Sequence, residues 1–332
     1  MTHWLQGMGY EINGGRIMIF PNKEIVEIIR KEYPAGTRVE LVKMDDLQAP
    51  PVGTKGTVRC VDDTGSILVK LDNGSCLNVL YGEDECKKYF DAVKERDKII
   101  TSIKERSKKE GWNKVILGIS GGKDSAIAAA LCVRALGKEN VYGVMMPDGK
   151  QPDIEDSIAV IEALDIPFKT VNISEIHHAL LTNCKSKGTK EDFDFEYKKE
   201  SDINVGPRIR TTVLRFIGQC IGALHVSTLN LSEYMVGYFT KGGDGPSDIS
   251  PLLEYTSVEA VEIGLTMPEL PERIVKKTPD DGLSGIPDEE KLGVTYPQIH
   301  DYLRKGTCGI MSVDYKIQEM IKKTGCSRVM VG

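Results

Sequence analysis

The residues best suited to chemistry lie together in one short segment, Gly118-Ile119-Ser120-Gly121-Gly122-Lys123-Asp124-Ser125. The segment follows the apolar run KVILGI and precedes a helical pattern that begins near Ser125. Adjacent glycines let the backbone approach a ligand, and a helix N-terminus presents free N–H groups and the positive end of its dipole. Both serines add hydroxyl donors, Lys123 adds positive charge, and Asp124 is suited to hold a magnesium ion. The segment therefore predicts a site for a pyrophosphate group and Mg²⁺.

A structural alternative is a glycine-rich turn in which Asp124 and Ser125 only cap the following helix. Ser-Gly-Gly-x-Asp-Ser is six positions long with five fixed, which favours the phosphate site. Its spacing differs from the loop of nucleoside triphosphatases and from the Gly-x-Gly-x-x-Gly of dinucleotide folds.

The motif resembles the signature of the ATP pyrophosphatases, which split ATP into AMP and pyrophosphate to adenylate an acceptor oxygen. Three further segments resemble the ammonia-dependent NAD synthetases within that group, and the whole resemblance spans roughly residues 85–305. The three segments are NVGPRIR (204–210), STLNLSEYMVGYFTKGGDGPSD (227–248) and DEEKLGVTYPQIHDYL (288–303).

The resemblance implies site residues position by position. Gly118 to Ser125 cradle the ATP phosphates, Thr228 contacts the adenosine part, and Glu233 joins Asp124 at magnesium. The residues expected to hold the second substrate, deamido-NAD, are Arg208, Lys241 and Asp248. Two alternatives stay open: Arg208 as part of an exposed basic helix start, and Glu233 as a carboxylate in the first turn of a helix.

The implied reaction joins a carboxylate to ammonia in two steps. The carboxylate of deamido-NAD attacks the α-phosphorus of ATP, and ammonia then displaces AMP from the adenylated carboxyl group. ATP, deamido-NAD, ammonia and Mg²⁺ are the expected partners, and free ammonia is the expected nitrogen donor because no glutaminase segment is recognised. Other hypotheses are a nucleobase- or tRNA-modifying adenylating enzyme and an inactive nucleotide-binding relative.

Four positions depart from the pattern of the resembled family. They are Ser257 in place of a lysine near the ATP phosphates, Asp280 in place of Ser or Thr, Cys326-Ser327 in place of His-Lys, and Met145 in place of an arginine. Lys276 or Lys277 is a candidate replacement for the missing cations. A Ser257→Lys variant is expected to bind ATP better if the helix that starts there directs its side chain at the phosphates.

The sequence predicts two domains, and the candidate site residues all fall in the second. Residues 37–81 contain short β-rich runs with an Asn73-Gly74 turn, which predicts a small Src-homology-3-like β-barrel after a helix at 22–33, forming a domain over 1–83. A helix at about 84–111 is expected to join it to a second domain, 84–332. Alternating apolar strands and helices there predict an α/β fold, a doubly wound parallel sheet of the adenine nucleotide alpha hydrolase-like kind.

The net charge and the apolar composition bear on whether the protein binds nucleic acid or spans a membrane. A formal net charge of −6 favours no nucleic acid partner, and no apolar run reaches the length of a membrane span, so we expect a cytoplasmic protein. The helix at about 208–223 has apolar residues on more than one face, as an interface helix would. The family resemblance implies a homodimer through this domain.

Overall fold

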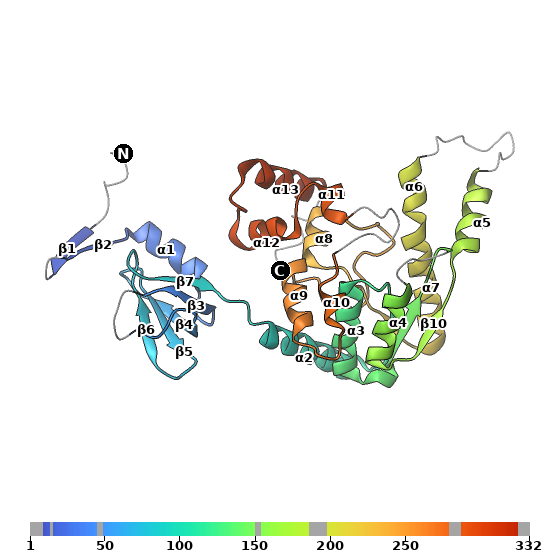
Figure 1. Ribbon diagram of the computed structural model, residues 1–332, viewed down its shortest axis with the longest axis horizontal. Coiled ribbons are helices and arrows are strands. Elements are labelled where there is room, and N and C mark those ends of the chain that lie inside the picture. Colours follow the sequence, from blue (N-terminus) through green and yellow to red (C-terminus); the bar gives the residue numbers. More distant parts are fainter. Residues whose placement is uncertain are drawn as a thin grey trace. The chain divides into compact units, whose positions relative to one another are not determined.

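The computed structural model describes residues 9–13, 16–44, 49–149, 154–185, 198–278 and 287–324. The chain divides into two compact units, Met1–Asp91 and Ala92–Gly332, each with its own core (Figure 1). The predicted α/β fold with a small N-terminal β domain is confirmed by these two units.

The first unit is a small antiparallel β domain with one helix. Its elements are β1 (Gly9–Asn13), β2 (Arg16–Phe20), α1 (Lys23–Glu32), β3 (Arg38–Lys43), β4 (Lys55–Val61), β5 (Ile67–Leu71), β6 (Cys76–Val79) and β7 (Glu85–Lys88). Strands β1 and β2 form a separate hairpin, whereas the other five have the order β6-β5-β4-β3-β7. The meander therefore ends with a strand that returns to pair with its first member. Asn73-Gly74 turns between β5 and β6, and Gly74 has the positive φ of +93° that such a turn favours.

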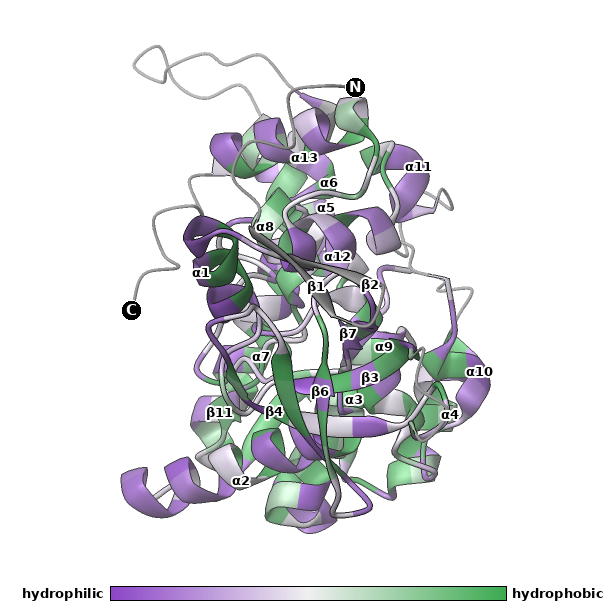
Figure 2. Cartoon of the chain, turned by 90° about the vertical axis from the view of Figure 1, so that its left-hand side faces the viewer, coloured by the Kyte–Doolittle hydropathy of each residue, from purple (hydrophilic) through white to green (hydrophobic). Residues whose placement is uncertain are grey.

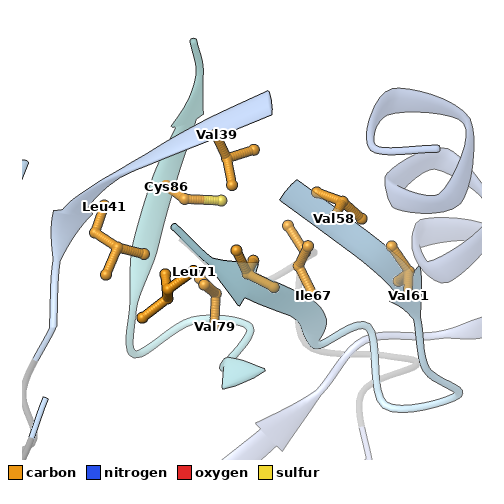
Figure 3. Close-up of a cluster of buried hydrophobic side chains, with 9 residues drawn as sticks. Val39, Leu41, Val58, Val61, Ile67, Leu71, Val79 and Cys86 are labelled. Atoms are coloured by element: carbon orange, nitrogen blue, oxygen red, sulfur yellow. The ribbon is translucent and has the colours of Figure 1, made fainter. Parts of the chain in front are cut away.

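The core of this unit lies on one face of the five-stranded sheet, because every second residue of a strand points to the same side. Figure 3 shows the side chains gathered there from all five strands. Ile29 of α1 packs against them, and Figure 2 shows α1 with both hydrophobic and hydrophilic residues, as an amphipathic helix requires.

The boundary between the units lies later than expected. The predicted helix at about 84–111 is wrong at its start, because residues 85–88 form β7, which pairs with β3 through Leu41 and Cys86. Cys86 is buried in the first core, and this burial raises the pKa of its thiol to about 11. The first unit accordingly runs past residue 83 to Asp91, and the helix begins only at Ala92.

The second unit alternates strands and helices along its first half. Its strands are β8 (Val115–Gly118), β9 (Val141–Met145), β10 (Phe168–Thr170) and β11 (Leu224–His225). Its helices are α2 (Ala92–Glu110), α3 (Lys123–Leu136), α4 (Ile154–Leu164), α5 (Ser174–Lys185), α6 (Lys199–Ile203), α7 (Val205–Ile221), α8 (Leu231–Val236), α9 (Ser257–Leu265), α10 (Glu272–Val275), α11 (Asp288–Leu292), α12 (Tyr296–Lys305) and α13 (Met311–Thr324), with the 3₁₀ turn η1 at Lys138–Asn140.

All four strands of this sheet are parallel, in the order β10-β9-β8-β11. The connections from β8 to β9 and from β9 to β10 run in one direction across the sheet, whereas the return to β11 passes to the other side of β8. Because such crossovers are right-handed, α3 and α4 cover one face and α5 and α7 the other. The sheet is therefore doubly wound: the strands stay parallel, but the chain adds β9 and β10 on one side of β8 and β11 on the other.

Helices after β11 form a layer of their own around α8. Val236 of α8 packs with Leu292, Tyr296 and Ile299 of α11 and α12, and with Ile317 of α13. This layer brings residues near 290 and 317 to the helix that follows β11. No helix within the described ranges is both long and apolar enough to span a bilayer.

Candidate functional site

Strands β8 and β11 are neighbours whose helical connections, α3 after β8 and α7 before β11, lie on opposite faces of the sheet, and this point marks the candidate ligand site. In open α/β sheets, ligands bind beyond the carboxyl ends of the strands at such a point, because the connections diverge there to opposite faces. The segment that follows β8 is the predicted phosphate loop, and the segment that follows β11 contains Thr228 and Glu233. A parallel bridge from Val226 to Ile249 brings the end of the 240–248 loop to the same edge.

The phosphate loop is held by its own serines. Ser120 N–H donates to Ser125 Oγ (3.3 Å), Gly122 N–H donates to Ser120 Oγ (3.2 Å), and Ser125 Oγ donates to the Gly122 carbonyl (2.9 Å). Gly121 has a φ of +81°, a conformation that strongly favours glycine. Gly122 caps α3 without any side-chain hydrogen bond, so the first N–H groups of the helix stay free of a side-chain acceptor. This arrangement is suited to bind an anion.

Lys123, which is buried, and Asp124, which is partly buried, form an ion pair at the first turn of α3. Lys123 Nζ donates to Asp124 Oδ2 at 2.5 Å, and its ammonium lies 5.7 Å from the centre of the Tyr296 ring. The other oxygen of Asp124, Oδ1, is buried and has no hydrogen-bond partner among the described residues.

Glu233 lies in the first turn of α8 and shares a capping box with Asn230. Glu233 N–H donates to Asn230 Oδ1, and Asn230 N–H donates to Glu233 Oε2, each at 3.1 Å. Burial, the nearby charge of Asp124 and, more weakly, that of Asp288 raise the pKa of Glu233 to about 8, although Lys123 offsets part of the rise. Both the helix-cap role and a role beside Asp124 are therefore compatible with its position.

Sequence reasoning assigned no role to Tyr296 and Asp288, which belong to the same neighbourhood. The Tyr296 and Tyr238 hydroxyls donate to the two oxygens of Asp288, at 3.3 and 2.9 Å. Burial and the charges of Glu233, Asp288 and Asp124 raise the pKa of Tyr296, so its hydroxyl stays protonated beside these carboxylates. The segment DEEKLGVTYP matches a family motif, but it lies more than 160 residues after the phosphate loop. Its sequence alone therefore does not indicate that Asp288 and Tyr296 lie close to Asp124 and Glu233.

A divalent metal suits this group of residues. Magnesium takes hard oxygen ligands, and Asp124 Oδ1 is a buried carboxylate oxygen without a partner in the described part of the chain. Within that part, no set of three or more His, Cys, Asp or Glu side chains is arranged to hold a metal by itself. The fit is therefore to an ion that takes its other ligands from water or from a bound phosphate.

The loop with Lys241 is fastened to the start of α7. Arg208 Nε donates to the Lys241 carbonyl (3.2 Å), and Thr211 Oγ1 donates to the Gly243 carbonyl (2.6 Å). A Cβ atom on Gly243 would come within 2.9 Å of Pro207, which explains the glycine at that contact. The side chains of Lys241 and Arg208 are exposed and close in the fold, so the structure brings these two predicted cations together.

Asp248 and Thr228 lie near the end of β11. The carboxylate of Asp248 accepts from His225 N–H (3.0 Å) and pairs with Arg215 (3.4 Å), so it connects the loop to the sheet edge. Thr228 is partly exposed between β11 and the cap of α8. Asp248 is thus engaged with the protein itself, in contrast to the exposed Lys241.

The unusual positions have distinct environments. Ser257, the first residue of α9, is 3% exposed, and its N–H donates to Ser232 Oγ. Met145 is buried in β9. Asp280 and Cys326-Ser327 lie outside the described residues.

The two lysines expected to compensate are engaged elsewhere. Lys276 pairs with Glu272 (2.5 Å), and Lys277 pairs with Asp156 of α4 (2.8 Å). Neither pair includes a residue of the phosphate loop.

Comparison with known proteins gives two family matches along the chain. Residues 95–331 match the NAD synthase family, and residues 22–89 match a domain of unknown function (DUF4314). The second match covers α1 and the five-stranded sheet.

Individual relatives agree with the first match. The NH(3)-dependent NAD(+) synthetase of Pyrococcus horikoshii is 37% identical over 232 residues, which cover 69% of this chain and 84% of the relative. That of Methanococcoides burtonii is 39% identical over 218 residues, 65% of this chain and 80% of the relative. Among solved structures, NMN synthetase from Francisella tularensis has a TM-score of 0.64 at 28% identity, covering 71% of this chain and 95% of its own. The NH3-dependent NAD synthetase of Campylobacter jejuni has a TM-score of 0.56 at 27% identity, with 73% and 99% covered.

Proposed function

Because the chain belongs to the NAD synthase family, we propose that it is a ligase that converts the carboxylate of deamido-NAD into the amide of NAD, with ATP and ammonia as co-substrates. The observation that carries the proposal is this membership, over residues 95–331, together with a phosphate loop at the point where β8 and β11 are neighbours. The fold, the family and the loop each favour binding of a nucleotide at the carboxyl ends of β8 and β11.

The ATP half of the site is assigned to residues 118–125 and to Thr228. The N–H groups at the start of α3 bind phosphate oxygens, and Ser120 and Ser125 keep the loop in shape through their mutual hydrogen bonds. Thr228 contacts the adenosine part from the end of β11.

The second half is assigned to Arg208, Lys241 and Asp248. Exposed Arg208 and Lys241 bind the negatively charged groups of deamido-NAD and bring its carboxylate to the α-phosphorus. Asp248 is held in one orientation by His225 N–H and Arg215, which suits a residue that positions a substrate.

Asp124 and Glu233 are the residues that would hold Mg²⁺. Bound there, the ion would supply positive charge against the phosphates of ATP. The chain's own contributions are the N-terminal dipole of α3 and the ammonium of Lys123, which act on the same phosphates.

The chemistry explains why so many positive groups are needed. A free carboxylate is a poor acceptor for ammonia, so its oxygen first attacks the α-phosphorus and pyrophosphate leaves. Ammonia then attacks the adenylated carbonyl carbon, loses a proton and expels AMP, which leaves the amide. The first step brings two anions together, and Lys241 and Arg208 offset that repulsion.

The direct test is incubation with ATP, Mg²⁺, ammonium and deamido-NAD, followed by measurement of NAD, AMP and pyrophosphate. Equal amounts of the three products are expected. The same assay with the carboxylate form of nicotinamide mononucleotide tests the acceptor, since one solved relative is an NMN synthetase. Turnover of the mononucleotide alone would contradict the proposed substrate.

An isotope experiment tests the adenylated carboxyl group. Deamido-NAD with ¹⁸O in its carboxylate should transfer one ¹⁸O atom to AMP, because that oxygen forms the bond to the α-phosphorus. Formation of ADP, or AMP without label, would contradict adenylation.

A homodimer through α7 is also proposed. Phe216 on α7 is 68% exposed, and Ile176 and Leu180 on α5, which packs against α7, are exposed too, so these helices offer large apolar side chains to a second copy. A Phe216→Asp variant should be monomeric by light scattering where the wild type is dimeric. A wild-type monomer with full activity would contradict the proposal.

A further inference from the structure

Lys123 occupies an unusual position for a lysine. Of the lysines in the described ranges it alone is buried, with 4% of its surface exposed. It also stands at the first position of α3, where the helix dipole is positive and disfavours a cation. Burial and the dipole both act against the charged ammonium, so its presence there needs a reason.

The carboxylates around it supply part of that reason. Lys123 Nζ donates to Asp124 Oδ2, and the charges of Asp124, Asp288 and Lys123 all act on Glu233. Lys123 is the cation among these groups, with the Tyr296 ring 5.7 Å away. The ammonium is therefore a positive charge placed inside a group of carboxylates at the nucleotide loop.

The ion pair is satisfied on one side only. Asp124 Oδ1 is buried and has no partner among the described residues, although buried carboxylate oxygens are normally hydrogen-bonded. One oxygen of Asp124 is thus occupied by Lys123 while the other is available to a ligand.

We propose that Lys123 exchanges partners during nucleotide binding: its ammonium neutralises Asp124 in the nucleotide-free protein and moves to a phosphate oxygen of ATP when Asp124 binds the metal. This rests on the proposed function, since it takes ATP as the ligand. It adds to that function an internal cation that competes with the metal for Asp124 before ATP arrives.

The exchange predicts effects of opposite sign when the ammonium is removed. Without ATP, a divalent cation no longer competes with Lys123, so Lys123→Met should bind Mn²⁺ more tightly than the wild type. In the presence of EDTA no metal reaches Asp124, so in Lys123→Met its carboxylate has no neutralising cation and repels the phosphates, and metal-free ATP should bind more weakly. Each change should be roughly tenfold or more, which is what one charge-assisted hydrogen bond contributes. A residue that only supports the fold would weaken both.

The experiment measures Mn²⁺ binding to the full chain without nucleotide by electron paramagnetic resonance, and metal-free ATP binding by calorimetry. The matched control is Lys138→Met, which breaks a Lys–Asp pair with Asp165 at the surface beyond the other end of α3. Both affinities should stay unchanged in that variant. A Lys123→Met protein with unchanged or weaker Mn²⁺ binding would overturn the exchange.

Variants that fail to fold and a wild type that fails to bind ATP also test the proposal. If Lys123→Met does not fold, Lys123→Gln is measured instead, because its amide still donates to Asp124 without the charge, and the same opposite shifts are expected. If neither variant folds, Lys123 is a structural residue and the proposal fails. A wild type that binds no ATP even with Mg²⁺ would overturn the proposed function as well, whereas normal ATP binding without the opposite shifts overturns the exchange alone.

Discussion

Helices α3 and α9 both lie in the second unit, yet their first turns differ in how fully their polar groups are satisfied. At α3 the cap is Gly122, which has no side chain, and the following lysine is buried beside a carboxylate. At α9 the cap is Thr256, which is fully buried and shares a capping box with Glu259.

The start of α9 is closed by its own side chains. Arg304 pairs with both oxygens of Glu259 at 2.7 and 2.5 Å, Thr256 Oγ1 shares a hydrogen bond with His300 Nδ1, and Ser257 N–H donates to Ser232 Oγ. Few groups are left for a ligand there. The contrast is that the first turn of α3 leaves N–H groups and one carboxylate oxygen without partners in the described part of the chain, as the proposed nucleotide site requires, whereas the first turn of α9 satisfies its own groups.

The largest effect is expected from Asp124→Asn on α3. The amide keeps the shape and can still accept from Lys123 through its oxygen, but it is a far weaker ligand for a divalent metal. Turnover should fall by about 100-fold or more, while the circular dichroism spectrum stays native. Asp165→Asn, at the surface pair with Lys138, is the control and should remain fully active. High activity of Asp124→Asn at saturating Mg²⁺ would count against the loop as the metal side of the site.

Ser257→Lys tests the first turn of α9, whose polar groups are satisfied by the protein itself. The sequence suggested that a lysine here improves ATP binding if its side chain reaches the phosphates, but Ser257 is buried and its N–H is bonded to Ser232. Forcing a long cation into this position should lower the free energy of unfolding by about 2–3 kcal/mol. The Michaelis constant for ATP should not improve. A lower constant in a stable variant would show that the start of α9 faces the nucleotide after all.

Thr256→Ala should affect stability alone. The variant loses the hydroxyl that caps α9 and leaves His300 Nδ1 without its partner, which should cost about 1 kcal/mol in chemical unfolding. Michaelis constants for ATP and deamido-NAD should match the wild type. A selective rise for ATP would mean that the two helix starts are not separate in function.

The sequence predicted the strand, turn and helix start at residues 115–125 well, because this signal is local, and their role as a phosphate loop stays a prediction. A strand, two glycines and a helix start are consecutive, and Gly121 indeed has the positive φ that the turn needs. The convergence of Tyr296 and Asp288 on the same place was not predictable, because it depends on α11 and α12 packing around α8.

Strand β7 was missed for a similar reason. It has four residues, of which only Cys86 is buried, so its own pattern is too short to distinguish a strand from a helix start. Pairing with β3, more than 40 residues earlier, decides its structure. Long-range contacts therefore account for both the misplaced boundary and the unassigned site residues.

The smallest expected effect concerns His300 and pH. Burial is the main cause that lowers the pKa of His300 from its usual 6.5; Arg304 and Lys305 lower it further, whereas Glu259 and Asp301 raise it. The folded protein thus favours the neutral ring, which contributes its full stability above about pH 6.5 and loses it as the pH falls through the lowered folded value. The difference in unfolding free energy between wild type and His300→Gln should therefore shrink on acidification from pH 7.5 to 5, with a slope of at most about 1.4 kcal/mol per pH unit for one proton. Urea unfolding of both proteins across this range measures it, and a difference that stays constant or grows at low pH would contradict the neutral ring at the cap of α9.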